Sequence, residues 1–104
     1  MAQFDVYENP ISRARRAYPF VVVLQSDLAQ TGRDRIVAPI APRSRLPGTA
    51  GRMTPHVQVA GAEHVVLVPS MTAVRADDLR APRGQLVADR DAIVAALDFL
   101  FLGV

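Results

Sequence analysis

The sequence has 104 residues, enough for one domain with one hydrophobic core, and with half of its residues apolar and 21% charged it is not that of a disordered chain. It has no cysteine, which excludes disulfides and thiolate zinc sites. The absence of cysteine suits a reducing cytoplasm, where we expect the protein to act. We expect a single domain over residues 1–104. Lysine is absent too, so twelve scattered arginines carry the basic charge. With a net charge of only +2, nucleic acid and an acidic protein segment are equally good candidates for a partner.

The first part of the chain predicts three β-strands. Residues 3–7 alternate polar and apolar side chains, as a half-buried strand does, and residues 20–24 form a continuous β-rich run that suits a central strand covered on both faces. Residues 35–40 predict a third strand, in which Pro39 is expected at an end or on an edge because proline cannot donate to a β-ladder. Between the first two strands, residues 11–17 predict a basic loop.

The middle of the chain predicts a long loop and further short strands. Residues 41–54 are rich in proline and glycine, and loops of this length are often functional or mobile. Residues 56–59 and 63–68 predict a hairpin, and residues 71–74 predict another short strand. The polar segment 75–84 predicts a link into a C-terminal helix. Five or six strands and one helix favour a mainly β fold, a small bent antiparallel sheet or barrel with a helix packed on it.

Residues 90–104 predict an α-helix that is apolar on more than one face. One apolar stripe comprises Ile93, Leu97, Leu100 and Val104, and the other faces carry Val94, Phe99, Phe101 and Leu102. One face can pack on the protein's own core, but leaving the others in water would forfeit ~1.5–3 kcal/mol for each large side chain. We therefore expect a homodimer that shares this helix, an exposed apolar tail, and a helix end at Gly103, since glycine adopts the left-handed cap conformation most easily.

Neither end of the chain predicts a membrane segment. The first ten residues lack the basic and apolar regions of a signal peptide. The C-terminal apolar run of about 13 residues is shorter than the ~20 that a membrane-spanning helix needs. We expect no membrane association.

Residues with catalytic potential form no convincing site. His56 and His64 have the same parity across the predicted hairpin, so they are expected to share a face, but two histidines without a third ligand make a poor metal site, and we interpret both as solvent-facing. An endoribonuclease site of Arg33 or Arg35 with Thr31 is an open alternative. There is no G-x-S-x-G nucleophile motif and no phosphate-binding glycine loop. The residues favour a binding protein over an enzyme, with no cofactor.

The order of short motifs along the chain resembles the CcdB toxins of bacterial toxin–antitoxin modules. The resemblance covers nearly the whole chain, and its most specific motifs are the Gln-Ser-Asp of Leu24–Leu28 and the ending Phe101-x-Gly103-Val104. Further matching segments are Gln3–Tyr7, 35–40 with the loop that follows, Pro55–Val59, 71–74 and 91–97. The resemblance implies an SH3-like antiparallel barrel with a small extra sheet and one C-terminal helix, assembled as a two-fold homodimer.

The resemblance also implies a target and an inhibitor. CcdB toxins of plasmid maintenance systems poison DNA gyrase by entering the cleft between its two A subunits and trapping the cleaved complex. The gyrase contacts implied for this chain are Leu102, Gly103 and Val104, with support from Phe101, Asp98, Leu28 and Ala29. A CcdA-like antitoxin with a disordered C-terminal segment neutralises the toxin. The protein would then meet DNA only indirectly, through gyrase or the antitoxin.

The antitoxin contacts are expected on the two predicted loops. Both combine mobile backbone with arginines that pair well with carboxylates, a suitable surface for a segment that folds on binding. The residues are Arg13, Arg15, Arg16, Arg43 and Arg45.

This chain departs from the plasmid-borne gyrase poison at two positions. Leu102 stands where that toxin has tryptophan, and Asp98 stands where it has asparagine. Tryptophan stacks on an arginine of the target for ~1–2 kcal/mol, whereas leucine offers apolar contact only. Three functions follow as alternatives: a gyrase poison, an endoribonuclease toxin on the related barrel fold, or a CcdB-like module that has lost gyrase poisoning.

Overall fold

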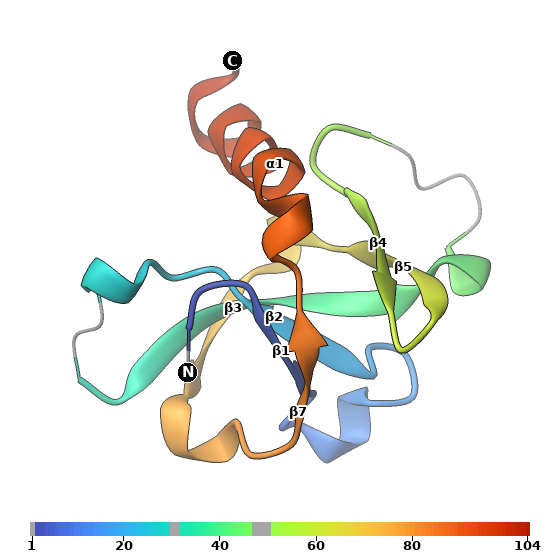
Figure 1. Ribbon diagram of the computed structural model, residues 1–104, viewed down its shortest axis with the longest axis vertical. Coiled ribbons are helices and arrows are strands. Elements are labelled where there is room, and N and C mark those ends of the chain that lie inside the picture. Colours follow the sequence, from blue (N-terminus) through green and yellow to red (C-terminus); the bar gives the residue numbers. More distant parts are fainter. Residues whose placement is uncertain (1, 30–31, 47–50) are drawn as a thin grey trace.

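The computed structural model describes residues 2–29, 32–46 and 51–104 and shows an antiparallel sheet curled into a half-barrel, with one α-helix packed across it (Figure 1). The strands are β1 (Asp5–Glu8), β2 (Phe20–Val23), β3 (Asp34–Pro42), β4 (His56–Val59), β5 (Ala62–Val66), β6 (Thr72–Arg75) and β7 (Pro82–Gln85). They are ordered β4-β5-β3-β2-β1-β7, and β6 pairs with β3. This confirms the predicted β-barrel fold with a C-terminal helix.

Strand β3 is the centre of the sheet because it pairs along both of its edges. One edge pairs with β2, while the other pairs with β6 over residues 34–37 and with β5 over residues 40–42. Pro39 lies inside this central strand, so its expected place at an end or on an edge is wrong. Its carbonyl accepts from the Leu67 N–H at 2.9 Å, on the edge where β3 changes partner from β6 to β5. A missing N–H there interrupts neither ladder.

The sheet is covered on both faces, as the continuous apolar run in β2 predicted. Val22 and Leu24 pack into the larger core, beneath the helix, whereas Val21 and Val23 pack into a second core on the opposite face. The second core also contains Tyr7, Val37 and Leu79. Burial raises the pKa of the Tyr7 phenol above its usual range, and the nearby Asp5 carboxylate raises it further, so this hydroxyl stays protonated at neutral pH.

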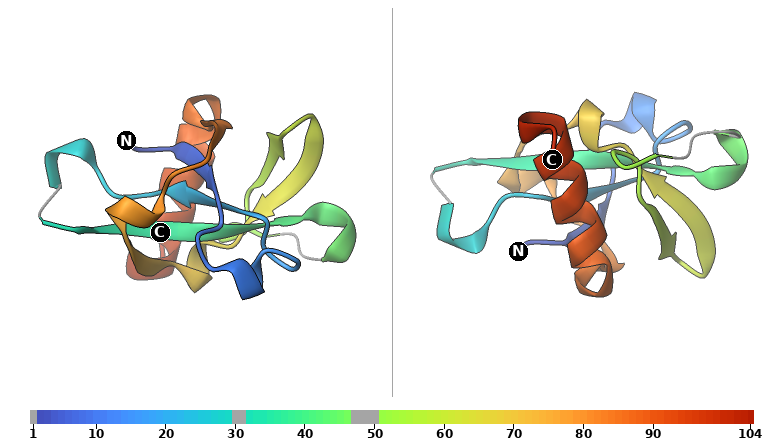
Figure 2. Two further views of the ribbon diagram at one scale, coloured as in Figure 1. Left: turned by 90° about the horizontal axis from the view of Figure 1, so that it is seen from below. Right: turned by 90° about the horizontal axis from the view of Figure 1, so that it is seen from above.

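The predicted C-terminal helix is present as α1 (Arg90–Leu102). It ends at Gly103, whose φ of 73° is left-handed and whose N–H donates to the Phe99 carbonyl at 3.0 Å, as expected of a glycine cap. Figures 1 and 2 show that α1 crosses over the sheet and that its C-terminal end projects beyond it. No helix in the described ranges is long and apolar enough to cross a membrane.

Strand β7 occupies the segment that was predicted to be only a link into the helix. It pairs with β1 at the edge of the sheet, with a register irregularity between Val6 and Tyr7. All four of its residues are exposed, and Pro82 and Gly84 are poor strand formers. No apolar alternation marked this strand, because its place depends on backbone pairing with β1.

The predicted hairpin is confirmed as β4 and β5, which form the small extra part of the sheet and join it through the end of β3. Its turn consists of Ala60 and Gly61, both at positive φ (53° and 77°), the geometry of a tight two-residue hairpin turn. The pairing of His56 with Val65 and of Val57 with His64 puts the two histidines on opposite faces, so the expected shared face is wrong.

Candidate functional site

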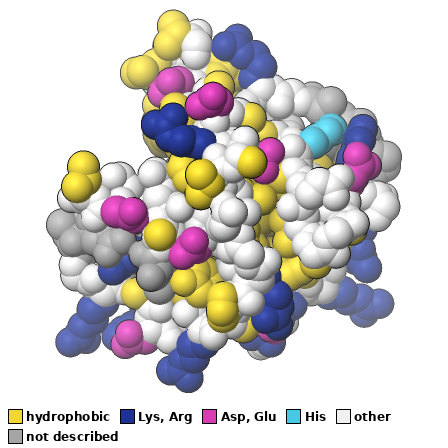
Figure 3. All heavy atoms as spheres, in the orientation of Figure 1, with side chains coloured by type: hydrophobic (Ala, Val, Ile, Leu, Met, Phe, Trp, Pro, Cys, Tyr) yellow, Lys and Arg dark blue, Asp and Glu magenta, His cyan; other side chains and the backbone are white. Residues whose placement is uncertain are grey.

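Large apolar side chains gather at the projecting end of α1 (Figure 3). Phe101, Leu102 and Val104 are 69%, 71% and 72% exposed, whereas Ile93 near the start of the helix is fully buried. The predicted exposed apolar tail is therefore present. The tail is exposed because α1 extends beyond the core: its first turns pack on the sheet, and residues 101–104 lie beyond it.

The side chains of α1 that pack on the core are not the ones that the sequence predicted. Val94, assigned to a face that needs a partner, packs against the protein's own core together with Leu97 and Leu100. Val104, assigned to the core-facing stripe, is exposed. The core therefore takes the apolar side chains of the first two to three turns, and those of the last turn remain in solvent. Asp98 is exposed on the same helix.

The Gln-Ser-Asp motif builds the short 3₁₀ helix η2 (Asp27–Ala29), on which Leu28 is 99% exposed. The Leu28 N–H donates to Ser26 Oγ at 3.1 Å, and the Asp27 carboxylate accepts from the Gln3 N–H at 2.8 Å. The Gln25 amide donates to the Ala29 carbonyl and accepts from the Ile36 N–H. Each side chain of the motif thus fixes the turn that displays Leu28 and Ala29.

The two groups of implied gyrase contacts lie apart within one chain. Figures 1 and 2 place η2 at one side of the molecule and the end of α1 above the sheet. The structure thus brings Phe101, Leu102 and Val104 together at one end of α1, but it does not bring them together with Leu28 and Ala29.

The basic loop is held in a defined conformation by Asn9, a buried residue at its start. The Asn9 side chain donates to the Tyr18 carbonyl at 2.8 Å and accepts from the Ile11 N–H at 2.9 Å, so it ties both ends of the loop together. Within the loop lies the 3₁₀ helix η1 (Ser12–Ala14). The loop presents its arginines from a fixed backbone, which is a better basis for recognition than a mobile one.

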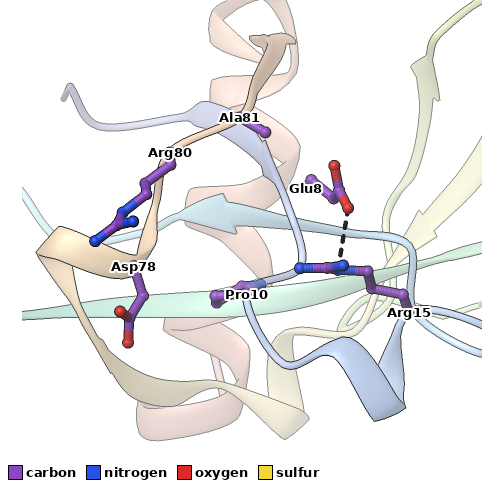
Figure 4. A pocket seen from close by; sticks show the side chains of 6 residues that line it. All are labelled: Glu8, Pro10, Arg15, Asp78, Arg80 and Ala81. Carbon is purple, nitrogen blue, oxygen red and sulfur yellow. Dashed lines mark ion pairs between the residues drawn. The ribbon is translucent and has the colours of Figure 1, made fainter.

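Arg15 differs from its neighbours because it is part of the structure of this loop. Its guanidinium pairs with Glu8 at 3.1 Å and donates to the Asn9 carbonyl at 2.6 Å, at the edge of a cleft of about 250 Å³ (Figure 4). Arg83 of β7 pairs with the same Glu8 carboxylate at 3.1 Å. Arg13 and Arg16 are exposed and form no ion pair with any residue in the described ranges.

The second arginine group lies on the 3₁₀ helix η3 (Arg43–Arg45) at the end of β3. Arg43 pairs with Glu63 of β5 at 3.3 Å. Arg45 has no ion pair in the part of the chain that the structure describes, and it lines an open groove of about 410 Å³. The groove is otherwise lined by Ala17, Tyr18, Ala41 and Leu46.

Tyr18 joins the two loops into one surface. It lines the groove beside Arg45 and also a neighbouring apolar hollow of about 210 Å³, whose rim includes the exposed side chain of Ile11. Tyr18 therefore lines both the hollow and the groove, and Arg45 of the second loop lines the groove. Neither Tyr18 nor Ile11 stood out in the sequence, because nothing local distinguishes a rim residue from an ordinary loop residue.

The histidines and the alternative arginine site gain no support as reactive groups. His64 is only 6% exposed, so its expected solvent-facing position is wrong; its ring packs edge-to-face on Phe20 at 5.4 Å. Arg35 donates to the carbonyls of Gly32 and Asp34 in its own turn. Thr31 lies outside the described residues. Within those residues, no three His, Asp or Glu side chains are grouped so that they could hold a metal ion.

Comparison with known proteins supplies one family assignment. A family model described as "CcdB protein" matches residues 3–103, nearly the whole chain. No curated protein sequence gives a significant match. The matched region contains the helix, the curled sheet, η2 and both arginine-bearing loops. This chain therefore belongs to the CcdB family, the toxins of a class of toxin–antitoxin modules.

Proposed function

We propose that this protein is a non-enzymatic toxin that binds the A subunit of DNA gyrase and traps the cleaved complex. The observation that carries the proposal is the cluster of Phe101, Leu102 and Val104, three large apolar side chains exposed at the free end of α1. A contiguous apolar patch of this kind marks a protein-interaction surface. The resemblance to gyrase poisons implies this end of the chain as their contact.

The geometry of the helix end suits insertion into a partner. Because Gly103 turns the chain out of the helix in a left-handed cap, Val104 leaves the helix axis instead of continuing its spiral. In a two-fold toxin dimer, two such ends engage a two-fold target together. The second contact is then intramolecular, and modest apolar contacts multiply through effective concentration.

The proposal is tested with purified protein, DNA gyrase and supercoiled DNA. Trapping of the cleaved complex yields linear DNA after denaturant and protease treatment, and the yield should rise with toxin concentration. A parallel incubation with RNA tests the endoribonuclease alternative. Cleaved RNA without linear DNA would replace the proposal by that alternative. If neither product forms while antitoxin still binds, the chain is a module that has lost gyrase poisoning.

The first prediction is that the protein is a homodimer. The resemblance to the CcdB toxins implies a two-fold dimer, and Val87, which is 57% exposed, is a large apolar side chain outside the proposed gyrase contact that a second copy would cover. Analytical ultracentrifugation at micromolar concentration should give about twice the chain mass of 11.3 kDa. A monomer at that concentration would contradict the two-fold mode of binding.

We further propose that the antitoxin binds across the two arginine-bearing loops. Arg13, Arg16 and Arg45 are exposed arginines without an ion pair in the described ranges. Arg45 lines the groove together with Tyr18, and Arg13 and Arg16 directly precede Ala14 and Ala17, which line the hollow and the groove. Carboxylates of an antitoxin segment can pair with these guanidinium groups, and its apolar side chains can fill the groove. Arg15 and Arg43 contribute indirectly, because each already pairs with a glutamate of the toxin.

The second prediction separates these two kinds of arginine. Reversing the charge of Arg13 and Arg16 to glutamate should weaken antitoxin binding about tenfold or more at low salt, and less at high salt, because the exposed charges are screened. Calorimetric titration at two salt concentrations measures this difference. The double variant Arg33→Glu/Arg90→Glu, which reverses two exposed arginines outside the proposed surface, is the matched control. Equal weakening by the control would show only a general charge effect.

A further inference from the structure

An arginine from outside the helix contacts the last part of α1 before its exposed end. The guanidinium carbon of Arg52 lies 4.1 Å from the centroid of the Phe99 ring, within the range of a cation–π contact. Figure 1 shows the segment that leads into β4 rising beside α1. Phe99 is partly buried, although it lies on a side of the helix that the hydrophobic core does not cover.

The turn that carries Arg52 is anchored to the sheet. The Thr54 N–H donates to the Gly51 carbonyl at 3.2 Å, which closes the turn around Arg52. The carbonyl of the next residue, the buried Pro55, accepts from the Val66 N–H of β5 at 3.0 Å. The guanidinium is therefore presented from the base of the β4–β5 hairpin.

Phe99 is in turn bonded to the cap that ends the helix. Its carbonyl accepts the N–H of Gly103 at 3.0 Å, the bond that closes the left-handed cap. Beyond Leu100 every residue of the chain is exposed, so the core gives the last turn little support. Contacts thus run from the hairpin through Arg52 and the Phe99 ring to the backbone that directs Leu102 and Val104.

We propose that Arg52 is a positioning residue for the tail: by stacking on Phe99 it restrains the last turn of α1 and the Gly103 cap. The functional part of this inference rests on the proposed gyrase contact of residues 102–104. The planar guanidinium covers the ring face, whereas an ammonium at the same place makes a smaller contact. Lysine should therefore replace Arg52 only in part, and alanine not at all.

The test compares Arg52→Ala, Arg52→Lys, Phe99→Leu and the double variant Arg52→Ala/Phe99→Leu with the parent protein. Backbone ¹⁵N relaxation should show lower order parameters for residues 101–104 in Arg52→Ala and Phe99→Leu, with Arg52→Lys intermediate and the β4–β5 hairpin unchanged. Gyrase trapping by Arg52→Ala should need about two- to fivefold more toxin, the factor to which an exposed cation–π contact corresponds. Arg75→Ala is the control for loss of one exposed arginine.

The double variant decides whether Arg52 acts through Phe99. If it does, removing Arg52 has no further effect on relaxation or trapping once Phe99 is leucine. Additive losses, or order parameters for residues 101–104 that Arg52→Ala leaves unchanged, would overturn the inference. Should the parent protein fail to trap gyrase, the proposed function falls, and the relaxation data still decide the positioning role.

Discussion

Removing residues 102–104 should abolish the trapping of gyrase while leaving the folded protein and its antitoxin binding intact. The deleted side chains of Leu102 and Val104 are about as exposed as those of a surface loop, and neither packs in the core beneath α1. Their loss therefore costs the fold little. If the tail is the gyrase contact, the deletion removes both copies of that contact at once, because the predicted dimer presents two.

The measurement is the yield of linear DNA with the truncated protein, beside its thermal unfolding and its affinity for antitoxin. Leu102→Trp is the informative companion: a stacking contact of ~1–2 kcal/mol should lower the toxin concentration needed for trapping about five- to thirtyfold. A truncated protein that still traps cleaved complexes would move the contact site elsewhere. Loss of the fold on truncation would show that the tail belongs to the core.

Replacing Ile93 by alanine should destabilise the protein by about 2–5 kcal/mol, because the side chain is fully buried and its loss leaves a cavity under α1. Such a loss is a large part of the ~5–15 kcal/mol that a domain of this kind has in total. Ile93 and Ala96 are the two fully buried residues of α1 in the described chain, so Ile93 is the largest fully buried side chain that attaches the helix to the core.

Chemical denaturation at a fixed protein concentration measures the effect, since the stability of a dimer depends on concentration. Leu102→Ala is the matched control, because it truncates a large apolar side chain on the same helix outside the core and should change stability by less than about 0.5 kcal/mol. Ile93→Ala should therefore lower the stability, whereas Leu102→Ala should lower gyrase trapping. If Leu102→Ala is as destabilising as Ile93→Ala, the end of α1 is buried in solution, in the dimer interface.

Several elements could be predicted because their signals are local. The apolar run in β2, the hairpin with its glycine turn and the helix with its glycine cap depend on residues that are neighbours in the chain. The exposed tail could be predicted too, because a helix that is apolar on more than one face cannot bury every apolar face in a chain of this length. The Gln-Ser-Asp motif was recognisable for the same reason: its side chains bond to their own turn and to the strands beside it.

Only the tertiary structure decided which residues meet across long separations. Strand β7 forms because β1 offers it a free edge, and Pro39 is tolerated in a central strand because β6 and β5 end on either side of it. The division of the arginines is of the same kind: Arg15 is structural because Glu8 lies across the loop, and Arg52 reaches Phe99 only once the hairpin is folded beside α1. In each case the partner is set by strand pairing and packing, which place residues together irrespective of the local pattern around either one.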